Sequence, residues 1–295
     1  MNLDGDLKQL RRSIDTKLAS ILPKESPIAE PMLKAMRYAV LGGGKRIRPL
    51  LTCTVCSALD GRVEDALLPG CAIELIHAYS LIHDDLPAMD DDDLRHGRPS
   101  THKQFGEAIA ILAGDSLHSL AFQSIVRAPD ISQDTKVKAI AALADAAGWR
   151  GMSGGQCLDI NSEGKRIPID QLRSLHAAKT GALICTSFQI GALCAGEDED
   201  SEHFRILTQV GRDIGLAFQI VDDILDVTSN SATLGKPSQS DEAAEKNTFP
   251  QLMGIEESQV EANKLLTSSL QLLCDTGIEN PALASLLRQT VLRKN

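Results

Sequence analysis

Long apolar segments with helical spacing run through nearly all of this 295-residue chain. They are rich in Ala and Leu, are longer than ordinary strands, and lack the alternation of apolar and polar residues that a half-buried strand requires. The sequence therefore predicts an all-α protein with about ten helices. The clearest segments are CAIELIHAYSLIH (71–83), EAIAILAGDSLHSLAFQSIV (107–126), GALICTSFQIGALCAG (181–196) and FRILTQVGRDIGLAFQIVDDILDV (204–227).

Breaks between these segments are short, such as GGG (42–44), GKRIPID (164–170) and GEDED (196–200). Length alone allows one or two domains. None of the breaks is long enough, or simple enough in composition, to be an interdomain linker. We therefore expect one domain over residues 1–295.

Composition excludes several classes of protein. A net charge of -10 and an aromatic content of 3% argue against a nucleic-acid binder. Seven cysteines, an odd number spread through apolar segments, indicate reduced core residues, and no histidine set completes a zinc site around Cys53 and Cys56. The N-terminus does not resemble a signal peptide, and no segment approaches about 20 uninterrupted apolar residues. We expect a soluble cytoplasmic protein without a membrane span.

A first acidic cluster follows the segment 71–83. Six aspartates occur in the ten positions 84–93. On a regular helix Asp84 and Asp90 would lie about 240° apart, but Pro87 ends or distorts the helix. Asp90 then turns back beside Asp84, while the remaining aspartates, Asp85 among them, stay outside direct metal contact or in solvent.

A second acidic cluster, FQIVDDILDV (218–227), contains Asp222, Asp223 and Asp226. Asp222 and Asp226 lie about 40° apart on one helix face, and Gln219 precedes Asp222 and Asp223 on the same face. The rest of this helix is apolar, so its carboxylates must be paired or bind a metal. Two such clusters without His or Cys ligands favour Mg²⁺, and we expect two acidic walls facing each other across a polyphosphate.

Basic residues accompany both clusters. Lys45, Arg46 and Arg48 occur in GGGKRIRP, which does not match a Walker A loop. Lys179 interrupts an apolar segment, so it must meet a carboxylate or a phosphate, with Asp159 as a candidate partner. We expect two anionic groups, one bound through Mg²⁺ and one bound directly by Lys and Arg. Further basic residues are Arg95, Arg98, Lys236 and Lys246.

The sequence resembles the trans-isoprenyl diphosphate synthases, most closely the bacterial short-chain farnesyl diphosphate synthases. The resemblance covers most of residues 34–254. It runs through GGGKRIRPLL, HAYSLIHDDLPAMDDDDLR, LAGDSLHSLAF, GGQCLDI, HAAKTGALI, FQIVDDILDVT, LGKPSQSD and KNTFPQLMG.

The resemblance implies a helical bundle around a central active-site cavity, an isoprenoid synthase type I fold, and a homodimer. It implies condensation of isopentenyl diphosphate with dimethylallyl or geranyl diphosphate by Mg²⁺-assisted ionisation, condensation and elimination. The implied product is (E,E)-farnesyl diphosphate. Geranyl or geranylgeranyl diphosphate synthase, a terpene cyclase and an inactive helical subunit remain as alternatives.

The resemblance also implies roles for individual residues. Three Mg²⁺ ions, which Mn²⁺ replaces, bind Asp84, Asp90 and Asp222, and the catalytic set adds Lys179 and Lys236. The allylic diphosphate and its ions contact Arg95, Lys179, Thr180, Gln219, Lys236 and Lys246. Isopentenyl diphosphate binds Lys45, Arg48, His77 and His96.

Two local features refine this expectation. His96 stands where the family usually has arginine, so we expect weaker, pH-sensitive binding of isopentenyl diphosphate. Tyr79 lies five residues, or about 7.5 Å along a helix, before Asp84, on the side toward which the product grows. With Ser80 beside it, and with Pro87 and Ala88 inside the acidic motif, the resemblance implies that Tyr79 stops growth at fifteen carbons; the alternative is that Tyr79 is simply a core residue. Segment 228–240 is expected to close as a lid.

Overall fold

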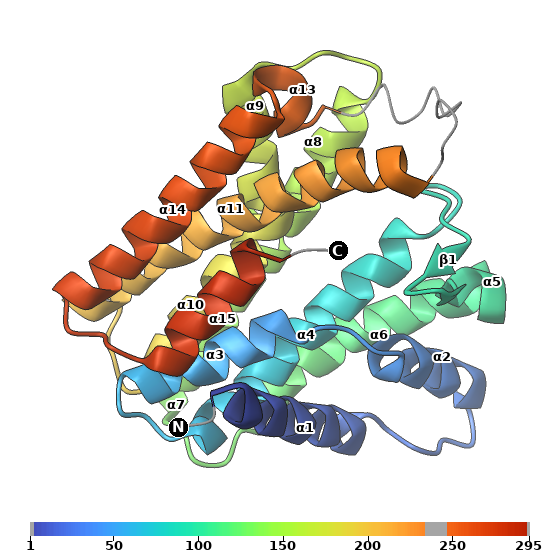
Figure 1. Cartoon of the computed structure of the whole chain (residues 1–295). Helices are drawn as coiled ribbons and strands as arrows, with labels where there is room; N and C mark the ends of the chain where they lie inside the picture. The colour runs from blue at the N-terminus through green and yellow to red at the C-terminus, as the bar shows by residue number, and fades with distance from the viewer. Residues whose placement is uncertain (1–2, 234–246, 294–295) are drawn as a thin grey trace. The chain divides into compact units, whose positions relative to one another are not determined.

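The computed structural model describes residues 3–233 and 247–293 of the chain (Figure 1). The described residues are almost entirely helical, which confirms the all-α prediction. Their helices outnumber the expected set because short elements, such as α5 and α13, fall in segments that the apolar pattern reads as connections. Contacts within the chain divide it into two compact units, so a single domain over 1–295 stays a prediction.

The first unit consists of Met1–Ala141 and Leu193–Gly196. Its elements are α1 (Leu3–Ile21), α2 (Glu30–Leu41), α3 (Ile47–Ala58), α4 (Val63–Asp84), β1 (Leu94–Arg95), β2 (Arg98–Pro99), α5 (Thr101–Phe105), α6 (Glu107–Val126) and most of α7 (Gln133–Ala147). Helix α4 packs against α3 and α6 (Figure 1). Its side chains Ile73, Leu75 and Ile76 are fully buried, which explains why this helix is apolar on nearly every face.

A small antiparallel hairpin interrupts the helices. Strand β1 pairs with β2 in the register Leu94 with Pro99 and Arg95 with Arg98. The two connecting residues, His96 and Gly97, have φ angles of 52° and 74°, the positive values that a tight hairpin turn requires. Each strand has 2 residues, too few for an alternating pattern to show in the sequence.

Helices α4 and α6 are long and apolar enough to cross a membrane by length and composition alone, although the sequence led us to expect no such segment. The most apolar 18-residue window of α4 is 61% buried inside the protein, and the corresponding window of α6 is 39% buried. A buried core helix passes the same test, so this is weak evidence for a membrane span.

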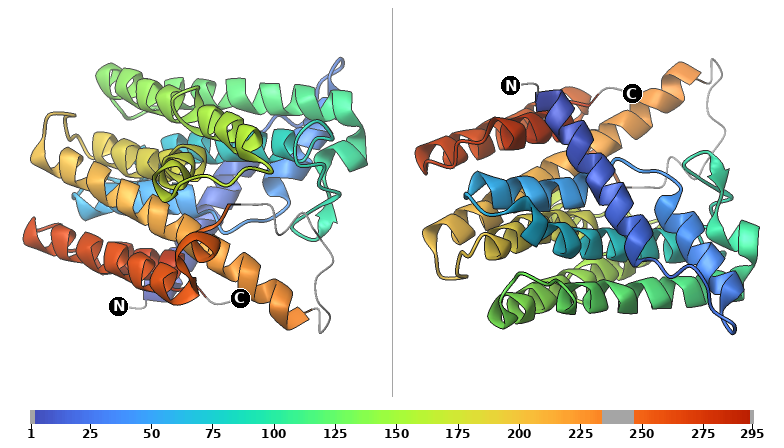
Figure 2. Two further views of the ribbon diagram at one scale, coloured as in Figure 1. Left: turned by 90° about the horizontal axis from the view of Figure 1, so that it is seen from above. Right: turned by 90° about the horizontal axis from the view of Figure 1, so that it is seen from below.

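The second unit consists of Ala142–Ala192 and Glu197–Asn295. Its elements are α8 (Met152–Ser162), α9 (Ile169–His176), the π-helix η1 (Ala177–Gly181), α10 (Ala182–Cys194, whose end joins the first unit), α11 (Glu202–Thr233), α13 (Phe249–Met253), α14 (Ile255–Asp275) and α15 (Pro281–Val291). Helix α14 lies alongside α11 (Figure 2), and α15 also packs on α11.

The π-helix η1 is a widened turn between α9 and α10. Turns of this kind interrupt an α-helix and are frequent at functional sites. Helix α8 approaches η1 closely: a Cβ atom at Gly155 would lie 2.3 Å from the backbone nitrogen of Lys179. Only glycine therefore fits at this position, and the approach places GGQCLDI (154–160) beside Lys179.

Candidate active site

The first acidic cluster begins where α4 ends, at Asp84. The chain then turns, and the backbone N–H of Asp90 donates a hydrogen bond to the carbonyl of Asp84 at 2.8 Å. Asp91, at φ 50°, donates to the carbonyl of Leu86 in the same turn. This geometry confirms the prediction that the break at Pro87 returns Asp90 to the side of Asp84.

Asp85 is a buried anchor of this turn, with 1% of its surface exposed. Its carboxylate accepts hydrogen bonds from Nε and Nη2 of Arg95, and Arg95 Nη2 also lies 3.1 Å from Asp92. Burial raises the pKa of Asp85, and the Arg95 guanidinium opposes this without cancelling it. Arg95, expected to bind diphosphate, is therefore held in the first acidic cluster by two carboxylates.

The outer aspartates lie in solvent, as the sequence predicts. Asp91, Asp92 and Asp93 are exposed, and Lys103 Nζ lies 2.7 Å from an oxygen of Asp93. Exposed pairs of this kind contribute little to stability, because solvent screens the charges. Their effect is to reduce the repulsion within the cluster.

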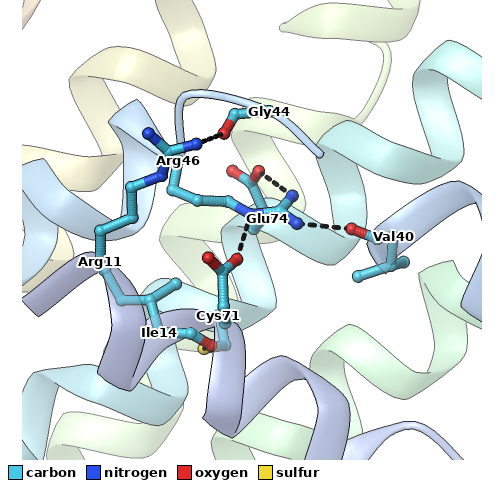
Figure 3. A network of polar contacts seen from close by, with 8 residues as sticks. Arg11, Ile14, Val40, Gly44, Arg46, Cys71 and Glu74 are labelled. Carbon is cyan, nitrogen blue, oxygen red and sulfur yellow. Dashed lines mark hydrogen bonds and ion pairs between the residues drawn. The ribbon is translucent and has the colours of Figure 1, made fainter. Parts of the chain in front are cut away.

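The loop that connects α2 to α3 is tied down by a buried ionic network (Figure 3). Gly43 and Gly44 have φ angles of 122° and 121°, and Arg46 has φ 55°. The Arg46 guanidinium donates to Asp15 Oδ1 at 2.8 Å, to Glu74 Oε1 at 3.0 Å and to the Val40 carbonyl at 2.7 Å. The sequence groups Arg46 with two candidate ligands of an anion, whereas the structure gives it a supporting role.

Electrostatics keeps Arg46 charged. Burial lowers the pKa of Arg46, but the carboxylates of Glu74 and Asp15 outweigh that effect and raise the pKa overall. Arg11 holds the same loop by donating to the Gly44 carbonyl at 2.7 Å. The network fixes the backbone on both sides of Lys45, whose own side chain is exposed.

Basic residues gather around His77 on α4. Burial lowers the pKa of His77 well below its ordinary value, and the nearby charges of Arg48, His96 and Arg95 lower it further. The imidazole is therefore neutral near pH 7, since its ordinary pKa is about 6.5. The structure brings together three candidate ligands of a second diphosphate, namely Arg48, His77 and His96, and also Arg95.

Tyr79, the expected chain-length residue, stands in an aromatic row. Its ring centroid lies 5.1 Å from that of His83 and 5.2 Å from that of His118 on α6, both edge to face. His118 in turn contacts Phe122 at 5.2 Å. The neighbouring Ser80 donates to the His77 carbonyl at 2.9 Å, so its hydroxyl is bonded to the helix backbone.

In the second acidic cluster, Asp223 is an internal acceptor. It is 5% exposed and accepts hydrogen bonds from His176 Nε2 at 3.2 Å, Gln219 Nε2 at 3.1 Å and the backbone N–H of Phe249 at 3.0 Å. These contacts join α9, α11 and α13. Asp223 is therefore paired, as the sequence predicts for a carboxylate on this helix, while Gln219 is engaged with Asp223.

Asp222 and Asp226 differ from Asp223 in their surroundings. Asp226 is exposed, and the side chain of Asp222 is 33% exposed and ion-paired with Arg293, the last residue that the structure describes. A cation therefore already lies beside the carboxylate that was expected to bind metal.

Lys179 lies on η1, and its Nζ is 2.6 Å from Asp159 Oδ2. This ion pair confirms the partner predicted from the sequence. Thr180 follows on the same turn and is half-buried. The two remaining candidate lysines, Lys236 and Lys246, lie outside the described residues, as does most of the expected lid; residues 228–233 continue helix α11.

Sequence reasoning missed three buried polar residues. Both amide atoms of Gln156 are buried and lack a hydrogen-bond partner among the described residues. His176 and Glu74 each face a charged group inside the protein. The signal was available: each is a polar residue in an otherwise buried helical segment, and burial of such a group requires a partner or a ligand.

Magnesium suits the donors present. Within residues 3–233 and 247–293, no group of three or more His, Cys, Asp or Glu side chains is arranged to hold a metal ion. Mg²⁺ does not need such a cage, because it binds one or two carboxylates and completes its shell with water and phosphate oxygens. The turn that places Asp84 beside Asp90, and the cation-paired Asp222, fit that mode of binding.

Comparisons with known proteins agree with this chemistry. A family model described as Polyprenyl synthetase matches residues 29–276. Farnesyl diphosphate synthase of Escherichia coli (strain K12) is 42% identical over 296 residues, covering 99% of this chain and 97% of that protein. Farnesyl diphosphate synthase of Haemophilus influenzae is 43% identical, covering 90% of each chain. The structure of an FPP/GFPP synthase from Zymomonas mobilis superposes with a TM-score of 0.84 at 37% identity, covering 99% and 98%. The chain therefore belongs to the polyprenyl synthetase family.

Proposed function

We propose that the protein is a prenyltransferase that condenses isopentenyl diphosphate with dimethylallyl or geranyl diphosphate. The observation that supports this most is the turn that returns Asp90 to Asp84, in the same unit as the basic loop residues Lys45 and Arg48. A site of this kind offers direct cationic ligands to a second diphosphate, apart from the carboxylates suited to Mg²⁺. A terpene cyclase, which ionises one diphosphate, has no use for such a group.

Mg²⁺ on the allylic diphosphate would be held by Asp84, Asp90 and Asp222. When bound, Mg²⁺ would neutralise charge that develops on the leaving diphosphate. Lys179 supplies a further cation for that diphosphate, and Asp159 fixes its position. Lys236 and Lys246 are proposed to add further positive charge around the same diphosphate.

The reaction then needs no nucleophilic side chain. The allylic C–O bond breaks to give a resonance-stabilised carbocation and diphosphate. The double bond of isopentenyl diphosphate attacks the cation, and the departed diphosphate takes the proton whose loss forms the new alkene. Lys45, Arg48, His77 and His96 hold the second substrate, and the lowered pKa of His77 means that it does so without a positive charge.

We infer that the product is (E,E)-farnesyl diphosphate. Tyr79 is braced by His83 and His118, so it is a rigid candidate for the floor of the product pocket. The two bacterial relatives described above are farnesyl diphosphate synthases, whereas the Zymomonas mobilis relative is described as an FPP/GFPP synthase. A longer product is therefore the second candidate. The enzyme is further proposed to be a cytoplasmic homodimer.

The test is a product analysis. Purified protein is incubated with Mg²⁺, labelled isopentenyl diphosphate and either dimethylallyl or geranyl diphosphate, and the dephosphorylated products are sized by chromatography. We expect fifteen-carbon farnesol from both allylic substrates and no product in EDTA. Cyclic hydrocarbons formed without isopentenyl diphosphate would identify a cyclase, and absence of any product with Mg²⁺ or Mn²⁺ would refute the proposed activity.

A further inference from the structure

The C-terminal arginine Arg293 covers one turn of the acidic helix α11. Its Nη2 lies 2.5 Å from Asp222 Oδ1 and donates to the Phe218 carbonyl at 3.1 Å. The centre of its guanidinium stacks on the Phe218 ring, 3.9 Å from the ring centroid. Phe218 and Asp222 are four positions apart and share a helix face, so one side chain contacts both.

The fold fixes the position of Arg293, because the residue directly follows a packed helix. Helix α15 packs on α11 and ends at Val291, which delivers Arg293 two residues later. The Arg293 side chain is 12% exposed, so its guanidinium is held against α11 and not in solvent. A guanidinium is planar and suited both to an aromatic face and to a carboxylate, and it stays protonated at any working pH.

We propose that Arg293 is the protein's own counter-ion for Asp222, which Mg²⁺ must displace, so that Arg293 sets the metal concentration that the enzyme requires. This inference rests on the proposed function, in which Asp222 is a metal ligand. Arg293 already neutralises the Asp222 carboxylate, and two cations at one carboxylate repel each other. Because arginine does not deprotonate, the pair opens by displacement rather than by a change of pH.

The test measures metal and anion binding without turnover. Inorganic pyrophosphate is titrated into the protein at a series of Mg²⁺ concentrations by isothermal calorimetry, which gives the Mg²⁺ concentration for half-maximal binding. We expect Arg293→Gln to lower this midpoint about tenfold, which corresponds to about 1.4 kcal/mol. Phe218→Leu removes the stacking partner and is expected to lower the midpoint by a smaller factor.

Two variants serve as controls. Arg288→Gln removes an exposed arginine from α15, the helix that precedes Arg293, and is expected to leave the midpoint unchanged. Asp222→Asn removes the shared carboxylate and is expected to raise it. If Arg293→Gln does not fold, deletion of residues 293–295 gives the same test.

The outcomes separate this inference from the proposed function. An unchanged midpoint in the Arg293 variants, with normal binding by the unaltered protein, overturns the counter-ion role alone. A higher midpoint also overturns it, because Arg293 would then help to bind the pyrophosphate. Failure of the unaltered protein to bind pyrophosphate at any Mg²⁺ concentration counts against the proposed function itself.

Discussion

Replacement of Glu74 by alanine tests the ionic network beneath the α2–α3 loop. Glu74 and Arg46 each have a side chain that is 6% exposed, so the substitution leaves a buried guanidinium without one of its two carboxylates. Removal of one partner from a buried pair costs about 3–5 kcal/mol. The second oxygen of Glu74, Oε2, is buried and lacks a hydrogen-bond partner among the described residues, which makes the native pair less favourable. We therefore expect a loss of about 3 kcal/mol.

Two further variants of the same network show how the loss of stability depends on charge and on burial. Glu74→Gln keeps the volume and one acceptor but loses the charge, so we expect a loss of about 1.5–3 kcal/mol. Asp15 contacts the same guanidinium, but its side chain is 46% exposed. Solvent screens that pair, and Asp15→Asn should cost less than about 1 kcal/mol.

The assay is urea unfolding followed by circular dichroism, with steady-state kinetics on the folded variants. Because Arg46 lies between Lys45 and Arg48, loss of its anchor should raise the KM for isopentenyl diphosphate more than the KM for the allylic substrate. A loss of stability for Glu74→Ala no greater than that for Asp15→Asn would refute the reasoning about burial. Equal changes in both KM values would refute the idea that Glu74 acts on isopentenyl diphosphate binding through the α2–α3 loop.

Three further predictions concern single side chains. His96→Arg should lower the KM for isopentenyl diphosphate, because a guanidinium is always charged and can bind two phosphate oxygens at once; an unchanged KM would contradict this. Tyr79→Ala should give products longer than fifteen carbons, measured by chromatography of the dephosphorylated chains, and farnesyl diphosphate as the unchanged end product would exclude Tyr79 as the floor. Burial lowers the pKa of His118. The unfolded state therefore binds the proton more readily, and stability should fall as the pH drops through the ordinary histidine range near 6.5. The urea midpoint of the unaltered protein should therefore fall between pH 8 and pH 5.5, and the midpoint of His118→Leu should fall less over the same range. An equal fall in both proteins would contradict a role of His118 in this loss of stability.

Much of the structure could be predicted from the properties of residues that are close together in the sequence. Apolar residues repeat with the helical period, so the main helices could be predicted without knowledge of their neighbours. Pro87 lacks a backbone donor and disfavours helical angles at Leu86, which predicts the return of Asp90 to Asp84. The pair formed by Lys179 and Asp159 followed from the cost of burying an unpaired charge.

The hairpin at Leu94–Pro99 could not be predicted from the sequence pattern. Its strands are too short to carry a pattern, and its turn depends on positive φ angles at His96 and Gly97. The turn aligns Arg95 so that Asp85 binds it. The sequence placed Arg95 among the diphosphate ligands without its carboxylate partners, since nothing in the residue order specifies which acid the guanidinium meets.

The sequence by itself determined which residues form the main helices and which carry charge, because both follow from the identity of near neighbours along the chain. Only the tertiary structure decided how those charges are used: Arg46 meets Glu74, Asp223 meets His176, and Arg293 meets Asp222. The physical reason is that an ion pair depends on distance and on exclusion of water. Both quantities are set when helices far apart in the sequence pack together, and neither is encoded in the local pattern.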